Sequence, residues 1–454
     1  MLELMAYIAN TPDDVQHMLA AIGLRSLDEL FDMVPPEFRL DRPLAIPPAL
    51  GELELTTGVG ALLARNQGAD RRPCFLGGGS YDHFVPAVVD VLSARGEFYT
   101  AYTPYQAEAS QGTLQATFEY QTLIAQLTGM DVSNASLYDG GSAASEAMLM
   151  AMTVTRRLGR VVVAGTVHPE YRAILGTFLA NLEPELVTVP ARGGKVDPAE
   201  LAEAVTDDTS AVILQHPNFF GGLEEIEALV EAAHARGALA IVSTDPIGLG
   251  LLKRPGAYEA DIVVAEGQSL GNHLNYGGPY LGILACREEY VRKMPGRVVG
   301  ETVDRHGKRC FTLTLQTREQ HIRREKATSN ICTNQGLLAL RASIYLAVVG
   351  PTGLRQAAEL STRKAHYAAE RLAAVPGLSL AFSTPFFKEF VVRSERAPAE
   401  VLAEVGRQGY HGGIALGRWY PDLADGILVA VTEKRTKDEI DGLAGAYAQA
   451  MAPV

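Results

Sequence analysis

Apolar residues recur along the middle of the chain in two alternating patterns. Short runs rich in β-branched residues, such as Arg160–Ala164 and Ala211–Leu214, are typical of buried strands. Between such runs lie longer stretches with apolar residues at helical spacing, such as Leu223–Arg236. Further strands are expected at Leu186–Val189, Ala238–Val242, Asp261–Ala265 and Tyr280–Ala285. This alternation predicts βαβ units, a mostly parallel sheet and helices on both of its faces.

Two more helices of this region are expected from the same pattern. One runs from Leu114 to Thr128, and the next opens after Gly140-Gly141-Ser142 and continues to Leu158. A shorter helix is expected after the capping pair Asp197-Pro198 and extends through Val205.

The two ends of the chain show different patterns. Residues Thr11–Val34 predict two short helices, the first capped by Thr11, and the proline-rich segment Pro43–Pro48 predicts an extended arm. After Asn334 the pattern changes to helices and short strands. These are expected at Gln335–Val349, Gly353–Ala373, Leu378–Ser383, Glu389–Val392, Pro398–Arg407, Ile427–Val431 and Thr436–Ala450. We therefore expect N-terminal helices and an arm over 1–65, a large α/β domain over 66–333 and a smaller α+β domain over 334–454.

Composition narrows the class of protein. The 454 residues are 47% hydrophobic and 20% charged, as in ordinary globular proteins. A net charge of −13 argues against a nucleic-acid binder, which needs a basic face. The N-terminus lacks the pattern of a secretory signal, and no apolar run reaches the roughly 18 residues of a membrane span. The four cysteines lack zinc-site spacing. We expect a soluble, cytoplasmic protein without a metal site.

The segment Glu97–Glu119 is dense in aromatic and hydrogen-bonding side chains before its apolar periodicity begins at Leu114. Such a loop is a candidate binding loop, and a packed connection with buried tyrosines is an equally good interpretation. Its candidate residues are Tyr99, Tyr102, Tyr105, Gln106, Glu108 and Gln111.

Two further segments have the residue types of a phosphate-bearing cofactor site. Gly140, Gly141 and Ser142 open a helix, whose free N–H groups and dipole suit a phosphate. Asp245 follows the strand Ala238–Val242, at the edge where parallel sheets bind ligands, and an Asp there can pair with a pyridinium nitrogen. Taken singly, an ordinary helix start and an Asp-Pro turn are the better interpretations of these segments.

The fourth segment, Glu266–Gly282, follows the strand Asp261–Ala265. Its His273 suggests a general base, although a lone histidine in a loop more often makes structural hydrogen bonds. Together the four segments fit an enzyme that uses pyridoxal phosphate (PLP), which needs a lysine after this strand to form a Schiff base. The stretch Val264–Leu270 contains no lysine, and nearby Lys253 lies in a surface-like turn.

The chain resembles the α (N-terminal) subunits of the two-subunit bacterial glycine decarboxylases, the P-proteins of the glycine cleavage system. The resemblance spans nearly the full length. It is carried by SLDELF (Ser26–Phe31), FLGGGSYDHFVPAV (Phe75–Val88), YTAYTPYQAEASQG (Tyr99–Gly112), SLYDGGSAASEAMLMA (Ser136–Ala151), Glu266–Gly282, RREKATSNICTNQG (Arg323–Gly336) and VTEKRTKDEID (Val431–Asp441).

This resemblance implies a fold, an activity and partners. The fold would be that of aspartate-aminotransferase-like PLP enzymes (fold type I), with a large, mostly parallel sheet domain and a smaller α+β domain. A sister β subunit would carry the lysine and the PLP, in a heterotetramer. Together the subunits would decarboxylate glycine and pass the aminomethyl group to the lipoyl arm of the H-protein. This chain would hold no PLP and no catalytic residue, and Gly140, Gly141, Ser142 and Asp245 would be vestigial cofactor positions.

In enzymes of this plan the active site lies near a subunit interface, so one subunit completes the pocket of the other. We therefore expect the tyrosine-rich loop, together with Ser329, Asn330, Thr333 and Asn334, to reach the site of the β subunit. The alternative is that these residues only bury interface area. The basic run Arg318–Lys326 could steer an acidic carrier protein, although a solvated helix face is the more common role.

Two other functions stay open at this point. One is an autonomous PLP-dependent lyase or aminotransferase, which requires the missing lysine. The other is a non-enzymatic regulator that keeps the scaffold.

Overall fold

The computed structural model describes residues 9–40, 42–101, 104–327, 329–331 and 335–452. Their contacts form two compact units, Met1–Asn66 and Gln67–Val454. In the first unit, helix α1 (Pro12–Ala21) begins at the predicted cap, where Thr11 and Asp14 each accept a hydrogen bond from the other's backbone N–H. The second predicted helix is a short 3-10 turn, η1 (Asp28–Phe31), and the extended segment leads into a helix that we did not predict, α2 (Glu52–Leu63).

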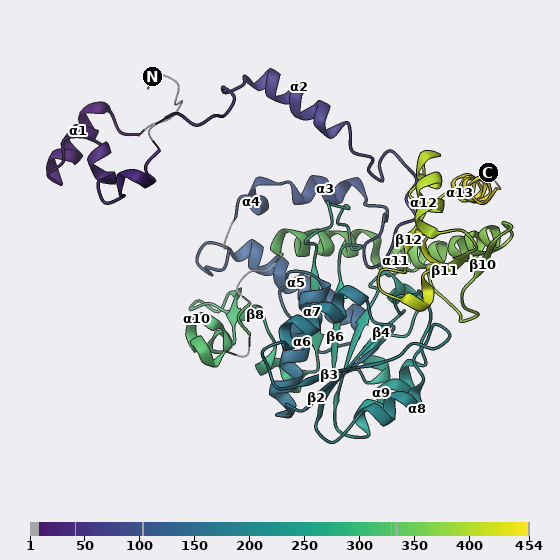
Figure 1. The fold of residues 1–454 in the computed structure, drawn as a ribbon. Coiled ribbons are helices and arrows are strands. Elements are labelled where there is room, and N and C mark those ends of the chain that lie inside the picture. Colours follow the sequence, from purple (N-terminus) through teal and green to yellow (C-terminus); the bar gives the residue numbers. More distant parts are fainter. Residues whose placement is uncertain (1–8, 41, 102–103, 328, 332–334, 453–454) are drawn as a thin grey trace. The chain divides into compact units, whose positions relative to one another are not determined.

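The second unit contains a seven-stranded sheet (Figure 1) in the order β1-β7-β6-β5-β4-β2-β3. Its strands are β1 (Val132–Ser133), β2 (Arg160–Ala164), β3 (Glu185–Val189), β4 (Thr209–His216), β5 (Leu239–Thr244), β6 (Ile262–Glu266) and β7 (Gly282–Cys286). Strands β2 to β6 pair in parallel, whereas β7 and β1 are antiparallel. The predicted mostly parallel sheet is therefore confirmed, with β2 at its predicted bounds.

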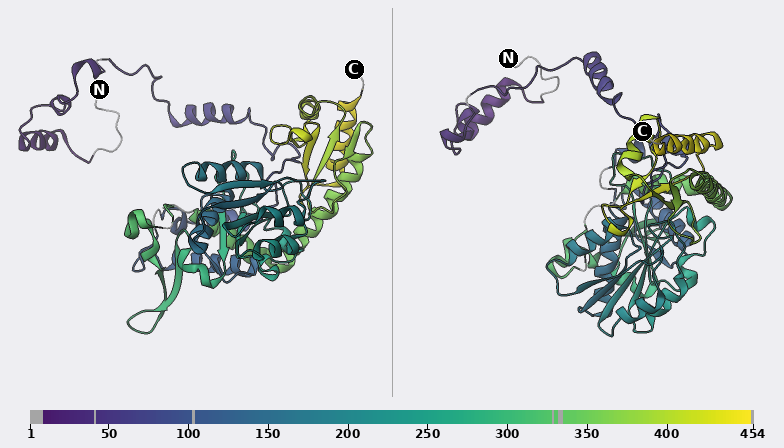
Figure 2. Two further views of the ribbon diagram at one scale, coloured as in Figure 1. Left: turned by 60° about the horizontal axis from the view of Figure 1, so that its bottom comes forward. Right: turned by 45° about the vertical axis from the view of Figure 1, so that its right-hand side comes forward.

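Helices cover both faces of this sheet (Figure 2). Helix α6 (Gly140–Thr155) packs against strands β4 to β7 and against α7 (Pro169–Leu179). Helices α8 (Pro198–Ala204) and α9 (Ile226–His234) pack against each other, and α9 packs on β4 and β5. With both faces covered, β5 is buried along its whole length, which explains its unbroken apolar run.

The smaller sheet, in the order β10-β11-β13-β12, lies in the C-terminal part of the same unit. Its strands are β10 (Leu378–Leu380), β11 (Glu389–Ser394), β12 (Ile414–Ala415) and β13 (Gly426–Ala430), and its helices are α12 (Pro398–Arg407) and α13 (Lys437–Met451). The elements that we did not predict in this unit are α3 (Ala87–Ser93), α4 (Gly96–Tyr99), α7, β1, β12 and the hairpin of β8 (Val298–Val303) and β9 (Arg309–Thr314). Among the described residues, the remaining α-helices are α5 (Gln111–Thr128) and α10 (Gln320–Arg323), together with α11, which is described next.

Helix α11 (Gly336–Ala373) joins the two cores of this unit. Its first part packs into the core of the large sheet through Tyr345 and Leu346, and its last part packs into the core of the small sheet through Leu372. At the predicted break between two helices, the helix is kinked. The kink lies at Gly350, which has a φ of 58° and is followed by Pro351. The helix is long and apolar enough to cross a membrane by composition, but its buried residues belong to these two cores. Because one helix serves both cores, the predicted division at residue 334 stays a prediction.

The parallel strands all end at one edge of the large sheet, where the residues that follow them gather. His168 follows β2, Asp245 follows β5 and Glu266 is the last residue of β6. The start of β11 brings Lys388 and Glu389 from the small sheet to this edge, so the two sheets meet at the predicted ligand position.

Candidate functional site

A buried lysine from the small sheet occupies the pocket at the strand ends. The Lys388 side chain is 2% exposed, and its Nζ lies 2.6 Å from Oδ2 of Asp245, which is 11% exposed. The same nitrogen lies 3.4 Å from the centre of the Tyr81 ring, a cation–π contact. Oδ1 of Asp245 accepts the N–H of Ile247 at 2.9 Å. Asp245 therefore forms both the predicted turn and a buried ion pair, and its charge is already neutralised from within the chain.

A histidine links this ion pair to a second carboxylate. Nε2 of His83 lies 2.9 Å from Lys388 Nζ, and Nδ1 of His83 lies 2.6 Å from Oε2 of Glu433. These partners assign the tautomer: neutral His83 accepts from the ammonium and donates its Nδ1–H to the carboxylate. The other oxygen of Glu433 accepts the N–H of Phe84 at 2.7 Å. The polar chain from Asp245 to Glu433 thus ties the two sheets together.

Glu389, next in sequence to Lys388, is held against a glycine-rich segment. Its Oε1 accepts the N–H of Gly78 at 2.7 Å, and its Oε2 accepts the hydroxyl of Tyr81 at 2.9 Å. A Cβ on Gly77 would lie 2.2 Å from Glu389 Oε1, so this close approach requires glycine. Burial raises the pKa of Glu389 to about 7, while the hydrogen bond from Gly78 and the charge of Lys388 oppose the rise.

Glu266 lies at the start of α6, where a phosphate would be expected. Its Oε2 accepts the N–H of Gly140 at 3.1 Å, and its Oε1 accepts the N–H groups of Gln268 at 3.0 Å and Leu281 at 2.9 Å. Burial raises the pKa of Glu266 to about 7, and these three donors limit the rise. The Ser142 N–H is also satisfied, because it donates to Oδ1 of the cap residue Asp139 at 2.7 Å. The predicted helix start is confirmed, and a carboxylate of the chain itself fills its anion position.

Gln268 lies in the stretch where a PLP enzyme would carry its Schiff-base lysine. Its Oε1 accepts the N–H of Tyr81 at 2.8 Å, and its Nε2 donates to the carbonyls of Tyr81 at 3.1 Å and Asn272 at 2.7 Å. The amide is therefore fully used in holding the segment around Tyr81. Nearby, His273 contacts Asp90 at 3.1 Å, which confirms its expected role in structural hydrogen bonding.

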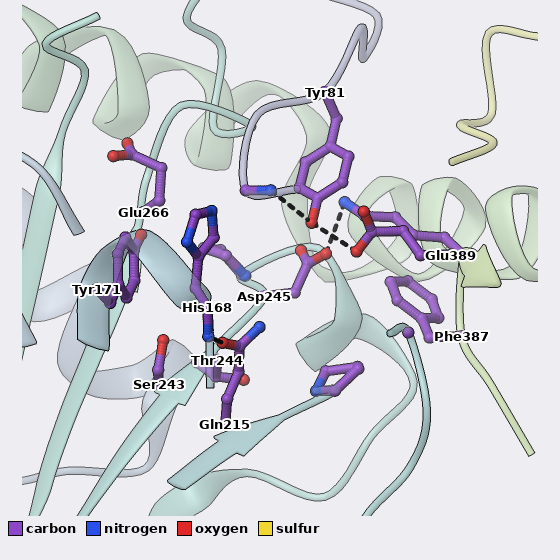
Figure 3. Close-up of a pocket in the computed structure, with 15 residues that line it drawn as sticks. Tyr81, His168, Tyr171, Gln215, Ser243, Thr244, Asp245, Glu266, Phe387 and Glu389 are labelled. Atoms are coloured by element: carbon purple, nitrogen blue, oxygen red, sulfur yellow. Dashed lines mark hydrogen bonds and ion pairs between the residues drawn. The ribbon is translucent and has the colours of Figure 1, made fainter. Parts of the chain in front are cut away.

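An aromatic stack lies in the middle of the pocket (Figure 3). The rings of His168 and Tyr171 stack with centroids 4.6 Å apart, and His168 Nε2 donates to the Gly78 carbonyl at 2.7 Å. His168 Nδ1 accepts the N–H of Glu170 at 3.1 Å, which requires a neutral ring, and burial lowers the pKa of His168 in agreement with this state. Figure 3 shows Asp245 and Tyr81 on one side of His168 and Glu266 on the other.

Little empty space remains between these groups. The cavity lined by Asp245, Lys388 and Glu266 has a volume of about 40 Å³, whereas ligand pockets typically measure about 300–1,000 Å³. A second cavity of about 190 Å³ shares His168 and Glu266 with the first and extends to Pro279. Glu266 lines both cavities.

The predicted binding loop lies away from this pocket, in a different cavity. Tyr99 and Tyr105 line a space of about 300 Å³ together with Gln335 and Gly336 at the start of α11. Tyr99 is exposed, whereas the Tyr105 ring lies 4.2 Å below the Arg297 guanidinium. The structure thus brings part of the tyrosine-rich loop close to Gln335, which directly follows the predicted turn Ser329–Asn334 in the sequence.

The remaining candidates of the tyrosine-rich loop have mixed surroundings. Gln106 and Glu108 are exposed. The Gln111 amide donates to the carbonyl of Phe311 in β9 and accepts its N–H, both at 2.8 Å, which is the structural role that we gave as the alternative. Tyr102 lies outside the described residues.

The turn that precedes α11 is described only in part. Ser329 accepts the N–H of Ile331 at 3.1 Å and hydrogen-bonds Glu146, a buried carboxylic acid whose pKa is raised by burial. Asn330 is exposed, and Thr333 and Asn334 lie outside the described residues.

The side chains of the predicted basic run differ in burial. In the run Arg318–Lys326, Arg318 is half-buried and donates to the Met294 carbonyl, while the residues from His321 to Lys326 are exposed. Glu319, within the run, pairs with Arg297 at 2.8 Å. Lys253 is exposed and pairs with Glu227, as expected of a surface turn. Within the described ranges, no three His, Cys, Asp or Glu side chains gather as a metal site.

Comparison with protein families gives a direct assignment. The model of the family described as "Glycine cleavage system P-protein" matches residues 5–447. The chain belongs to this family. It is 53% identical to a protein of Carboxydothermus hydrogenoformans named "Probable glycine dehydrogenase (decarboxylating) subunit 1", over 97% of this chain and 98% of the relative. A protein of Moorella thermoacetica with the same name is 50% identical over 97% of this chain and 99% of the relative.

Solved structures agree with the P-protein assignment. A crystal structure of glycine decarboxylase (P-protein) of the glycine cleavage system, in inhibitor-bound form, superimposes with a TM-score of 0.91 at 44% identity, covering 98% of this chain and 100% of that chain. A sphingosine-1-phosphate lyase of Burkholderia pseudomallei, at 16% identity and a TM-score of 0.66, covers 91% of this chain and 93% of its own and shares the fold. These neighbours confirm the predicted PLP-dependent, fold type I architecture.

The pocket of this P-protein family member does not fit PLP as it stands. Asp245, which would pair with the pyridine nitrogen, is paired with Lys388. The start of α6, which would bind the phosphate, is bonded to Glu266. The cavity between these groups has a volume of about 40 Å³, which is roughly the space that one or two water molecules occupy.

Sequence reasoning missed the residues that fill this pocket. It identified Asp245 and Gly140, but it did not identify Lys388, Glu389 or His83. His83 lies in the glycine-rich segment FLGGGSYDH, whose three successive glycines signal a close backbone approach. Lys388 carried no local signal, because its role depends on a contact with a distant strand.

Proposed function

We propose that this chain is the subunit of a two-subunit glycine decarboxylase that does not hold the cofactor. Together with a second subunit that carries PLP on a lysine, it decarboxylates glycine and transfers the aminomethyl group to the lipoyl arm of the H-protein. The observation that carries this proposal is Gln268: the stretch after β6 offers an amide bonded to Tyr81 instead of a free amine. Relatives named "subunit 1" that match nearly the whole chain support the need for a second subunit.

The assignment of the cofactor is tested by reduction with borohydride. The chain is co-expressed with a lysine-bearing second subunit, incubated with PLP and reduced, and the two chains are separated and weighed by mass spectrometry. We expect the pyridoxyl adduct on a single lysine of the second subunit. A stoichiometric adduct on Lys388 of this chain would instead support an autonomous PLP enzyme.

The activity is tested with the purified complex. We expect carbon dioxide release from carboxyl-labelled glycine when both subunits and lipoylated H-protein are present. Either subunit alone should release it at a rate at least a hundredfold lower, as an order of magnitude, since the chemistry needs the complete site. Full activity of the second subunit alone would leave a regulatory scaffold as the function of this chain. We further propose a cytoplasmic heterotetramer, which the mass of the purified complex would reveal.

We also propose that the tyrosine-rich loop and the turn before α11 complete the site of the second subunit. The cavity shared by Tyr99, Tyr105 and Gln335 supports a joint role for the two segments. Tyr102→Phe, which removes one hydroxyl from this loop, should lower the turnover of the complex without dissociating it. Tyr138→Phe, an exposed tyrosine outside the loop, is the matched control. Unchanged turnover of the Tyr102→Phe complex would leave only interface burial as the role of this residue.

A further inference from the structure

We propose that this chain carries an internal substitute for a cofactor: Lys388 takes the place of the ligand's cation at Asp245, and Glu266 takes the place of its phosphate at the start of α6. Both recognition features of a PLP pocket are thereby present and are used within the chain. This inference concerns binding and stability, and it does not depend on the proposed activity.

The cationic end is defined by three contacts on one buried ammonium. Lys388 Nζ contacts Asp245 at 2.6 Å and His83 at 2.9 Å, and it lies over the Tyr81 ring at 3.4 Å. A carboxylate at this strand end pairs with a ring nitrogen in PLP enzymes, because it stabilises the protonated form of that nitrogen. Here a lysine ammonium supplies the positive charge. A buried carboxylate would be unstable without such a partner, so the lysine also allows Asp245 to persist.

The anionic end is defined by backbone donors. A helix start offers N–H groups and the positive end of a dipole to an anion. The Gly140 N–H donates to Glu266, which also accepts from Gln268 and Leu281, so the carboxylate sits where anion-binding geometry is available. At pH 8 the carboxylate form of Glu266 dominates, since its pKa is about 7.

The ion pair of Lys388 and Asp245 also joins the small sheet to the large sheet. Lys388 directly precedes β11 of the small sheet, whereas Asp245 directly follows β5 and Glu266 is the last residue of β6 in the large sheet. The internal substitute therefore fastens the small sheet over the pocket by an ion pair, as a bound ligand would. The adjoining cavity of about 190 Å³ is also lined by Glu266, so truncation of this side chain would enlarge the space available at this point.

The test asks whether removal of the substitute restores ligand binding. Pyridoxine 5′-phosphate is the probe, because it lacks the aldehyde and cannot react with surface lysines. At pH 8 we expect no saturable binding to the wild-type chain by fluorescence titration. The Glu266→Ala/Lys388→Ala variant should bind the probe saturably, with a dissociation constant at least tenfold below the highest probe concentration at which the wild type shows no saturation, and its thermal midpoint should rise on binding. The matched control is Glu227→Ala/Lys253→Ala, which removes an exposed ion pair of the same two residue types.

A second measurement keeps the proposal testable if the double variant does not fold. Lys388→Ala alone leaves a cavity beside Asp245, and ethylammonium at millimolar concentration should raise the thermal midpoint of this variant but not that of the wild type or of Lys253→Ala. Equal binding of the probe by wild type and double variant would overturn the proposal. So would a folded double variant that binds no probe, or equal effects of ethylammonium on all three proteins.

Discussion

The ion pair between Lys388 and Asp245 makes a quantitative prediction about stability. Two unit charges 2.6 Å apart attract by about 6 kcal/mol at an effective dielectric constant of about 20, and desolvation of both groups offsets much of this gain. Removing one partner is different, because it leaves the other buried charge without compensation. We therefore expect Lys388→Met to lower the free energy of unfolding by about 3–5 kcal/mol.

A double-mutant cycle separates the ion pair from other effects of the substitution. Asp245→Asn keeps an oxygen that can accept the N–H of Ile247, so this variant chiefly removes the charge. The double variant Asp245→Asn/Lys388→Met removes both charges, and it should lose about 1–3 kcal/mol less than the sum of the two single variants.

The assay is urea unfolding of the full chain, followed by far-UV circular dichroism and by the fluorescence of Trp419, the one tryptophan of the sequence. Lys253→Met is the matched control, since its ion pair with Glu227 is exposed and should contribute less than about 1 kcal/mol. A free energy of unfolding for Lys388→Met within about 0.5 kcal/mol of the wild-type value would show that the buried ion pair does not stabilise the fold, and would refute the reasoning.

Three further predictions concern the surrounding structure. Burial raises the pKa of Glu266 from 4.5 to about 7, so the folded chain binds more protons than the unfolded chain between these values and stability falls as the pH rises through them. Glu266→Gln should reduce this slope by up to about 1.4 kcal/mol per pH unit, and an unchanged slope in urea unfolding would contradict the shift. A Cβ on Gly140 would lie 2.1 Å from the Tyr171 hydroxyl, so Gly140→Ala should lower the free energy of unfolding by about 1–3 kcal/mol. The double variant Gly140→Ala/Tyr171→Phe should recover part of this loss, and no recovery would exclude the clash as its cause. Gln121 makes two buried 2.9 Å hydrogen bonds to β8, so Gln121→Ala should lower the free energy of unfolding by about 1–3 kcal/mol and speed hydrogen exchange in that strand. Substitution of the exposed Gln115 by alanine is the control and should do neither.

Much of the architecture could be predicted because it depends on local patterns. The β-branched run Arg160–Ala164 and the helix Pro398–Arg407 were predicted at their observed bounds, since strand and helix periodicities are properties of neighbouring residues. The family resemblance was also available from the sequence, because its motifs are long and contiguous. Helices α2 and α7 and the β8–β9 hairpin were missed. The apolar residues Tyr171, Ile174, Leu175, Phe178 and Leu179 of α7 do recur at helical spacing, so this helix could have been predicted from the sequence. Helix α2 buries none of its residues, so no core-facing stripe marks it. Gln111 and Gln121 hold the β8–β9 hairpin through hydrogen bonds to residues far along the chain.

The sequence by itself determined that the stretch after β6 lacks a lysine, that Gly140 opens a helix and that Asp245 follows a strand, because each statement concerns adjacent residues. Only the tertiary structure decided what meets these groups. Lys388 reaches Asp245 because the small sheet packs against the edge of the large one, and Glu266 reaches Gly140 because β6 ends beside α6. Such contacts arise from the packing of elements that are distant in sequence, and burial then makes each unpaired charge costly enough that its partner becomes essential.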